Sequence, residues 1–173
     1  MPTSDPAIKN VLIEHVKKIG MPELILDIGL GNGGYGERFK KINPNIIMIG
    51  IEIFPAYIRD DWGYSKLYDK IYIDDMRLFD YSKVNADLVI AGDVIEHVEK
   101  AEGIKVINEL KKHFDWVLIA LPIQDVIQGP DNEFGNKHEE HKHQWKPQEM
   151  VDATELKYIA DAGICGLFEF RKV

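Results

Sequence analysis

Residues 24–34, LILDIGLGNGG, decide the fold of this chain because a short apolar run passes directly into a cluster of glycines. The run Leu24–Ile28 is short and mostly apolar, which predicts a buried strand. The glycines allow a sharp turn, positive φ angles and the close approach of a ligand to the backbone. Residues 34–42 carry apolar side chains at helical spacing, so a helix whose first N–H groups are unpaired is expected after the turn. The sequence therefore predicts a strand, a ligand-binding turn and a helix in succession.

Apolar runs and amphipathic stretches alternate along the rest of the chain. Further strands are expected at residues 46–51, 70–73, 87–91 and 116–120, the first of which is expected to be buried, and helices are expected at residues 6–19, 98–113 and 147–153. Residues 55–66 have weak periodicity and form a helix or a loop, and the tail 156–173 holds two strand-like segments separated by Gly163 and Gly166. Buried strands with helices between them indicate a parallel sheet covered on both faces, whose ligands bind at the carboxyl ends of the strands.

Length, charge and cysteine content narrow the class of protein. A chain of 173 residues is expected to form one domain, and its single cysteine, Cys165, is expected to pack in the core. The net charge of −8 and the absence of a basic run argue against nucleic acid as a partner. No apolar stretch approaches the length of a membrane span, and residues 1–5 lack the pattern of a signal peptide. We therefore expect a cytoplasmic protein that binds neither a membrane nor a nucleic acid.

Two patterns fit the glycine cluster. Gly29, Gly31 and Gly34 fit the dinucleotide pattern G-x-G-x-x-G, which is weak alone. Asp27, Gly29, Gly31 and Gly33 fit D-x-G-x-G-x-G, which resembles motif I of the class I S-adenosylmethionine-dependent methyltransferases. A buried acid at Asp27 suits a cationic ligand group, whereas beside a pyrophosphate its negative charge would be unfavourable. In that family the matching acid helps to hold the amino acid end of the cofactor. The alternative is that Asp27 only braces the loop by accepting N–H bonds.

The resemblance continues at the ends of the next two predicted strands. Glu52 ends the second strand, where an acid can accept both ribose hydroxyls of an adenosine. After the third strand, the family pattern implies that Asp75 contacts the adenine amino group and that the backbone at Met76 contacts the ring. Asp74 is an alternative shifted by one residue, and a solvated turn is the alternative for the whole segment.

The fourth strand is followed by residues 91–98, AGDVIEHV, which resemble motif IV of the same family and the "EH" segment of many members acting on small molecules. The resemblance implies that Asp93 faces the cofactor and the methyl group, and we take it as a catalytic candidate. Glu96 and His97 begin the next helix. For His97, a hydrogen bond that only stabilises the junction between loop and helix is an equal alternative.

Four successive strand ends match over residues 20–125, and the tail is compatible with the last two strands of the family. The resemblance implies a Rossmann-like, doubly wound, mostly parallel seven-stranded sheet with helices on both faces and an antiparallel last strand, in a single domain over residues 1–173. It also implies S-adenosylmethionine as cofactor. Two departures are Leu30, where small or polar residues are frequent, and Glu52 in place of the commoner Asp.

Residues 122–146 form a long polar loop after the fifth strand, a place where loops of this length are functional. By resemblance to a subset of bacterial small-molecule methyltransferases, Asn136, Glu139, His141 and Trp145 are the substrate-side candidates. His141 has three alternatives: a general base, since imidazole titrates near neutral pH, a structural hydrogen bond, or a metal ligand. Trp145 is either a lid or an anchor.

We predict no metal site in this loop. His138, His141 and His143 with Glu139 could bind Zn²⁺ or another divalent ion. Their spacings in an irregular loop, however, match no strong metal signature.

The predicted function is transfer of a methyl group from S-adenosylmethionine to an oxygen, or to a nitrogen, of a small polar molecule such as a sugar. One alternative is a non-catalytic partner subunit that binds the cofactor. Another is an NAD-binding oxidoreductase that uses the dinucleotide pattern, but nothing in the chain resembles a catalytic Tyr-Lys pair. The oligomeric state is left open.

Overall fold

The computed structural model describes residues 5–59 and 63–172 of the chain. The expectations for residues 1–5, 55–66 and 156–173, and the predicted domain bounds 1–173, extend partly outside these residues. The strands are β1 Leu24–Ile28, β2 Ile47–Glu52, β3 Lys70–Ile73, β4 Leu88–Gly92, β5 Trp116–Pro122, β6 Lys157–Ala162 and β7 Cys165–Arg171. The helices are α1 Pro6–Ile19, α2 Gly34–Ile42, α3 Tyr64–Leu67, α4 Lys100–His113 and α5 Pro147–Thr154. Short 3₁₀ turns are η1 Pro55–Tyr57, η3 Tyr81–Lys83, η4 Ile95–His97 and η5 Lys137–Glu139.

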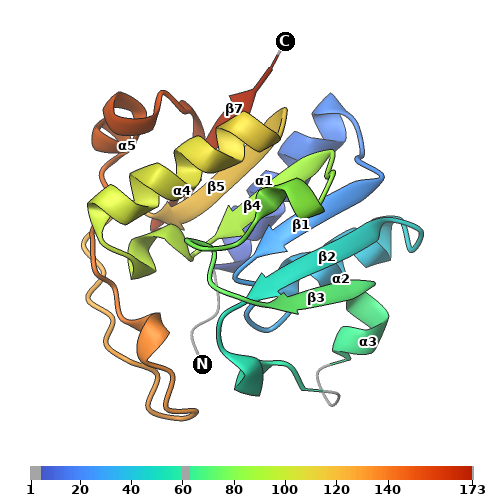
Figure 1. Ribbon diagram of the computed structural model, residues 1–173. Helices are drawn as coiled ribbons and strands as arrows, with labels where there is room; N and C mark the ends of the chain where they lie inside the picture. The colour runs from blue at the N-terminus through green and yellow to red at the C-terminus, as the bar shows by residue number, and fades with distance from the viewer. Residues whose placement is uncertain (1–4, 60–62, 173) are drawn as a thin grey trace.

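All seven strands form one sheet in the order β3-β2-β1-β4-β5-β7-β6 (Figure 1). The first five strands in this order, β3, β2, β1, β4 and β5, are parallel to their neighbours. Strand β7 is antiparallel to both β5 and β6. The chain passes from β1 to β2 on one side and later returns to β4 on the other. The carboxyl ends of β1 and β4 therefore flank a topological switch point, where ligands bind in sheets of this kind.

Helices cover both faces of the sheet, as the sequence predicts. Helix α1 packs with α2 and α3 on one face, and α4 packs with α5 on the other (Figure 1). Each layer buries its own apolar cluster against the strands. Ile8, Leu12 and Val16 represent the first layer, and Ile107 and Leu110 the second. Burial of two such clusters is the main favourable term that stabilises the fold.

Local signals set the bounds of the elements. The side chain of Asp5 accepts a 2.8 Å hydrogen bond from the backbone N–H of Ala7 at the start of α1, and Pro6 occupies the first turn. Residues 95–97 form the separate turn η4, so α4 begins two residues later than predicted.

The prediction that Gly166 separates the last two strands is wrong. The residue lies inside β7, where it pairs with Leu121 of β5 and Asp161 of β6, and the hairpin turns at Gly163 instead. A Cβ on Gly166 would lie 2.9 Å from the Cγ2 atom of Ile123. Close packing, and not a turn, therefore requires glycine at this position.

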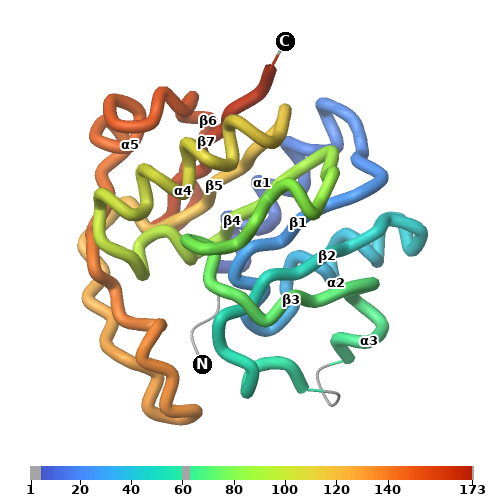
Figure 2. Tube along the Cα trace, viewed as in Figure 1, coloured from blue at the N-terminus to red at the C-terminus, as the bar shows by residue number. Residues whose placement is uncertain are grey.

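The polar loop after β5 runs out past the carboxyl ends of the parallel strands and returns to α5 (Figure 2). It is tied to the segment after β2, because the Tyr57 hydroxyl donates a 2.7 Å hydrogen bond to Asp131. Phe134 packs edge-on against the Tyr57 ring at 5.7 Å. The loop therefore has fixed contacts on the side of the sheet where a ligand would bind.

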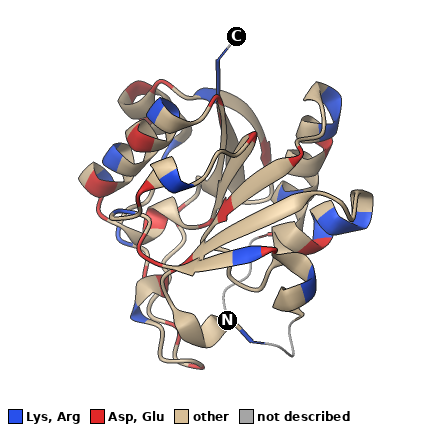
Figure 3. Cartoon of the chain, turned by 45° about the vertical axis from the view of Figure 1, so that its right-hand side comes forward, with Lys and Arg blue, Asp and Glu red and all other residues tan. Residues whose placement is uncertain are grey.

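Charges are mixed over the surface. Lysines and arginines alternate with acidic residues along the helices, without a basic stripe on any helix that the view displays (Figure 3). Within residues 5–59 and 63–172, no helix combines the length and apolar character needed to cross a bilayer.

Candidate functional site

A cavity of about 380 Å³ opens at the carboxyl ends of β1, β2 and β4. Its wall combines the turn after β1, the ends of β2 and β4, the turn η4, the N-terminal part of α1 and the loop 122–146. The position agrees with the switch point of the sheet. The site candidates that line it are Gly29, Gly31, Glu52, Asp75, Met76, Asp93, Asn136, Glu139 and His141.

The glycine turn has backbone angles that other residues avoid. Gly29, Gly31 and Gly33 have φ values of 70°, 50° and 75°. A Cβ on Gly29 would lie 2.7 Å from Cγ2 of Val94, so the turn also packs directly against the segment after β4. Gly29 and Gly31 line the cavity. Gly33 does not line it and is the N-cap of α2, at the end of the turn.

Asp27 lies near the end of β1, is buried, and is not among the residues that line the cavity. Its Oδ2 accepts a 2.6 Å hydrogen bond from the hydroxyl of Tyr68, while its Oδ1 has no hydrogen-bond partner in the described part of the chain. Burial raises the pKa of this carboxyl to about 6, and the bond from Tyr68 and the charge of Lys9 act in the opposite direction. No backbone N–H bonds to the side chain of Asp27 among the described residues, so the bracing role is not seen there.

Glu52 projects into the cavity from the end of β2 and is almost completely buried. Its Oε2 accepts a 3.3 Å hydrogen bond from Gly31 N–H, and its Oε1 a 2.9 Å bond from Phe54 N–H. Burial raises the pKa of this carboxyl to about 7, against the effect of the two backbone donors. The acid is thus held against the glycine turn, as expected for a group that binds hydroxyls.

The segment after β3 brings Asp74, Asp75, Met76 and Arg77 to the cavity. Asp75 is held by Arg77, whose Nη2 lies 2.6 Å from Asp75 Oδ2, and Arg77 also pairs with Glu102 of α4. Burial acts to raise the pKa of Asp75, but the hydrogen bonds and charge of Arg77 outweigh it and lower that pKa. The carboxylate is therefore shared with a salt bridge, while Met76 offers a buried apolar surface.

Asp93 follows β4 with φ 50°, one of two described residues other than glycine with positive φ. Such a conformation costs about 1–3 kcal/mol and is concentrated at functional sites. The thiol of Cys165 donates a 3.7 Å hydrogen bond to Asp93 Oδ1, and Cys165 is buried as predicted. Burial, followed by the charge of Asp93, raises the pKa of this thiol. The backbone is thus held in a strained form that presents Asp93 to the cavity.

Lys9 of α1 is a site residue that the sequence analysis missed. It lines the cavity, is only 5% exposed, and its ammonium makes no ion pair or hydrogen bond with any residue in 5–59 or 63–172. Burial lowers its pKa first, followed by the charge of Arg38, whereas Asp93 and Asp27 act in the opposite direction. A lysine between two buried positions of the apolar face, Ile8 and Leu12, was the available signal.

The ammonium of Lys9 sits at the start of α2, since a Cβ built on Gly34 would lie 2.5 Å from Nζ. The first N–H groups of a helix already carry partial positive charge. A buried cation beside them is unfavourable by itself, and the two together favour an anion. Tyr35 completes this corner, with Lys9 Nζ 5.5 Å from the centre of its ring.

The structure brings three of the four loop candidates to the cavity. Asn136 accepts a 2.9 Å hydrogen bond from His138 N–H and donates a 3.3 Å bond to Glu139. His141 Nδ1 lies 2.8 Å from the carbonyl oxygen of Val126. Trp145, in contrast, is completely buried in the cluster under α4 and does not line the cavity. Of its two alternatives, lid or anchor, the position fits an anchor.

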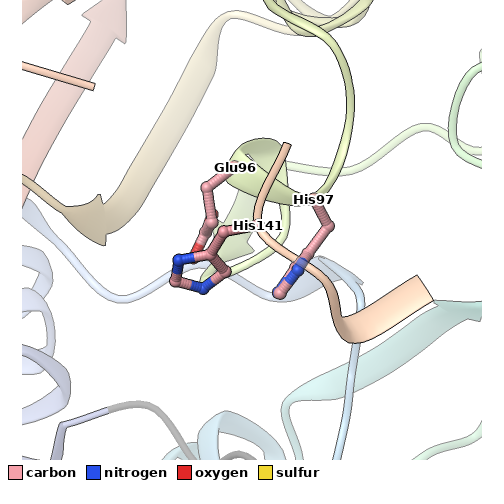
Figure 4. Close-up of side chains that lie close together, drawn as sticks. All are labelled: Glu96, His97 and His141. Carbon is pink, nitrogen blue, oxygen red and sulfur yellow. The ribbon is translucent and has the colours of Figure 1, made fainter. Parts of the chain in front are cut away.

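Glu96, His97 and His141 form a cluster at the wall of the cavity (Figure 4). One carboxylate oxygen and one ring nitrogen from each histidine lie within 4.8 Å of one another. Burial, followed by the charge of His141, lowers the pKa of His97 to about 4. The set predicted as an alternative from the loop is not assembled, because His143 pairs instead with Glu149 at 3.0 Å.

No family model matches this chain, and no curated protein matches it in sequence. Solved structures, however, match its fold. The small RNA methyltransferase HEN1 superposes with a TM-score of 0.72 at 15% identity, over 99% of this chain and 26% of that one. The methyltransferase domain of bacterial CtHen1 gives 0.72 at 13% identity, over 98% of this chain and 100% of that one. The N-terminal domain of EvdMO1, crystallised in the presence of SAH and D-fucose, gives 0.68 at 12% identity, over 98% and 84%.

This chain therefore spans about a quarter of the HEN1 chain and the whole of a single methyltransferase domain. Together with the strand order, the similarities show that it has the Rossmann-like fold of the class I methyltransferases. The predicted fold is confirmed, including the seven strands and the antiparallel β7.

Proposed function

We propose that this protein is an S-adenosylmethionine-dependent methyltransferase that methylates an oxygen of a small polar molecule. The observation that carries the proposal is the charge pattern of the cavity. One end pairs a glycine turn with the buried acid Glu52. The other end has the ammonium of Lys9, which has no ion pair among the described residues, beside Asp93 and near the charge of Asp27 behind the wall. That pattern complements a ligand with a ribose at one end and an amino acid at the other.

The nucleoside half of the cofactor fits the first end. Gly31 leaves the backbone open to a ring, because a Cβ there would meet nothing closer than the carbonyl oxygen of Gly29 at 3.8 Å, and the two oxygens of Glu52 can accept from two adjacent ribose hydroxyls. Met76 would pack on the adenine. Asp75, with Asp74 next to it, would accept from the adenine amino group, in competition with Arg77.

The amino acid half fits the second end. A carboxylate there would lie between the Lys9 ammonium and the N–H groups that begin α2. Its negative charge would offset the repulsion between the ammonium and the partial positive charge of these N–H groups. The ammonium of the ligand would face Asp93, which lines the cavity, and would reach Asp27, which lies behind the wall, through water. Oδ1 of Asp27 has no partner in the described part of the chain, which supports this placement, because a buried acceptor without a donor is costly.

S-adenosylmethionine, when bound, supplies a methyl group already activated on a sulfonium. The residues of this chain then have to align the acceptor, exclude water and receive a proton. Asp93 is fixed at the end of β4 beside the proposed position of the methyl group. His141 lines the same cavity, and because its Nδ1 is held by the carbonyl oxygen of Val126, its Nε2 carries the lone pair that can accept a proton. Asn136 and Glu139 supply further hydrogen-bonding groups for the acceptor molecule.

A small uncharged or cationic acceptor suits the cavity better than a polyanion. Carboxylates outnumber cations in its wall, where Glu52, Asp74, Asp75, Glu96, Glu99, Glu102 and Glu139 surround Lys9, Arg77, Lys137 and Lys142. HEN1 is a small RNA methyltransferase, but a phosphate backbone would meet repulsion here. EvdMO1, crystallised in the presence of D-fucose, supports a sugar-like acceptor.

Calorimetric titration with S-adenosylmethionine, S-adenosylhomocysteine and NAD tests the cofactor. We expect the two adenosyl ligands to bind in the micromolar range and NAD to give no signal. Binding of NAD alone would overturn the proposal in favour of an oxidoreductase. Cofactor binding without methylation in a screen of sugars and small hydroxy compounds would favour a non-catalytic partner subunit.

A further inference from the structure

We propose that Glu96, His97 and His141 bind a divalent transition-metal cation, such as Zn²⁺ or Mn²⁺, at the wall of the cavity. The three side chains come from two segments, the turn η4 and the loop 122–146, and point into one shared space (Figure 4). Their ligand atoms already lie within 4.8 Å of one another. A cation at their centre would bring these atoms to ordinary coordination distances after small side-chain shifts.

The backbone holds the two segments together at this point. The carbonyl oxygen of Glu96 accepts hydrogen bonds from Lys142 N–H at 2.8 Å and from His143 N–H at 3.2 Å. The N–H of His141 in turn donates to the carbonyl oxygen of Gln128 at 2.9 Å. Main-chain bonds therefore hold the two segments together, and the contacts of the two Nδ1 atoms with carbonyl oxygens orient the rings.

Both histidines present a ring nitrogen that carries a lone pair. Nδ1 of His141 lies 2.8 Å from the carbonyl oxygen of Val126, and Nδ1 of His97 lies 3.4 Å from that of Glu140. A carbonyl oxygen only accepts, so each Nδ1 has to carry the proton. Nε2 then carries the lone pair that can ligate, which is the arrangement in which a carbonyl oxygen orients a metal-binding histidine. The ring of His97 also has hydrogen bonds with the backbone of Asp93 and Glu139, and a bound cation would compete with them.

Glu96 supplies an independent reason for a cation. Its side chain is only 2% exposed, and neither carboxylate oxygen has a hydrogen-bond partner in the described part of the chain. The nearby acids Asp93 and Glu139 add negative charge around it. A buried carboxylate in such surroundings needs either a cation or a bound proton, because isolated burial of the charge is very costly.

The ligand set indicates the class of cation. Two imidazoles and one carboxylate suit Zn²⁺, Mn²⁺, Fe²⁺ or Co²⁺, and they are a poor set for Ca²⁺ or Mg²⁺, which prefer oxygen. Three protein ligands leave open positions toward the cavity. Resting on the proposed function, those positions would hold an oxygen of the acceptor molecule, and His141 would then act as a ligand in place of a proton acceptor.

The test measures metal binding without cofactor or activity. The protein is stripped with a chelator and titrated with Co²⁺, followed by the visible absorption of the bound ion, and with Mn²⁺ and Zn²⁺ by calorimetry. We expect saturable binding of a single equivalent. Glu96→Gln and His141→Gln should each weaken it at least about 10-fold, since even loss of an outer-shell partner weakens metal binding by that factor. His138→Gln, from the same loop and cavity wall, is the matched control and should bind as the wild type does.

A second variant guards against loss of folding. His141→Asp keeps a ligand atom and should bind Co²⁺ more tightly than His141→Gln, with an altered absorption spectrum. No saturable binding by the wild type, or equal binding by Glu96→Gln and His138→Gln, would overturn the proposal and assign a proton to Glu96.

Titration of S-adenosylhomocysteine in the presence of chelator separates the two proposals. Cofactor binding without metal binding refutes only the metal site, and metal binding without cofactor binding refutes only the proposed function.

Discussion

The hydroxyl of Tyr68 donates a 2.6 Å hydrogen bond to Oδ2 of Asp27, and it is the hydrogen bond that the buried carboxylate receives among the described residues. Tyr68 follows directly after α3, so the bond fixes the edge of the sheet to the end of β1. The second oxygen faces no donor in that part of the chain, and burial raises the pKa of Asp27 to about 6. The unliganded protein thus contains an acid whose charged form is disfavoured by burial.

Asp27→Asn is expected to change stability and binding in opposite directions. The folded pKa of Asp27 is raised, so this group favours folding below about pH 4, and that contribution is lost as the pH rises through about 6. At pH 8 the unliganded variant should therefore be more stable than the wild type by roughly 1–3 kcal/mol, with little difference at pH 4. Urea unfolding at the two pH values measures this. The same variant should bind S-adenosylmethionine roughly 10–100-fold more weakly. Equal stability profiles together with unchanged binding would show that Asp27 only supports the loop.

Lys9→Met should weaken binding of S-adenosylhomocysteine roughly 10–100-fold, because the proposed partner of the ligand's carboxylate is lost while the apolar stem is kept. The free protein should be no less stable, since the ammonium is buried without an ion pair among the described residues. Calorimetry gives the affinity and thermal unfolding the stability. Lys18→Met, at an exposed position of the same helix, is the control. A large loss of stability with unchanged affinity would make Lys9 a structural residue.

Gly29→Ala should destabilise the protein by about 2–4 kcal/mol, which combines the strain of a positive φ with a clash against Val94. Gly135→Ala separates the two effects. Gly135 has a similar φ of 72°, but a Cβ there would meet nothing within 4 Å, so the loss should be about 1–2 kcal/mol. Urea unfolding of both variants provides the comparison. If the two losses are equal, the packing of the turn against Val94 contributes nothing.

Local patterns account for the parts of the fold that the sequence could predict. The apolar runs that became β1 and β3 have the predicted bounds. Most of β1 is buried, whereas β3 lies at the edge of the sheet and its residues are exposed or half-buried. Asp27, Glu52 and Asp93 follow from the ends of β1, β2 and β4, since a parallel sheet brings all its carboxyl ends to one edge. Other predicted bounds differ from the observed ones by one or two residues. Strand β5, for example, was predicted to end at residue 120 and ends at Pro122.

The remaining site residues depend on contacts between distant segments. Nothing around Lys9 in the sequence shows that α1 would reach the start of α2, because that distance is set by helix packing. The pairing of His141 with Glu96 is fixed by main-chain bonds from Lys142 and His143, which leave no pattern in the side-chain sequence. Sequence spacing suggested instead a set within the loop, where His143 turns away to Glu149.

His141→Ala is expected to slow turnover by about 100-fold or more, while the affinity for S-adenosylhomocysteine changes less than about 3-fold. The reason is that His141 lines the acceptor side of the cavity, whether its Nε2 takes a proton or ligates a cation. Steady-state kinetics with the acceptor found by screening, together with calorimetry, provide both numbers. Full activity of the variant would remove His141 from the reaction.

Trp145→Phe should leave kcat and KM nearly unchanged and cost less than about 2 kcal/mol of stability, whereas Trp145→Ala should cost about 3–5 kcal/mol. Trp145 is completely buried, stacks edge-on against His143 at 4.7 Å, and has no hydrogen-bond partner for its indole N–H in the described part of the chain. Phenylalanine keeps most of this packing and removes a buried donor that is unsatisfied, whereas alanine leaves a cavity under α4. Because the side chain lies outside the wall of the binding cavity, the loss in both variants should appear in urea unfolding and not in turnover at low temperature. A Trp145→Phe variant of normal stability whose turnover is about 100-fold slower than that of the wild type would contradict this prediction, because that loss is expected for a catalytic group. Trp145 would then contact the substrate, and the loop 122–146 would have to move to bring it there.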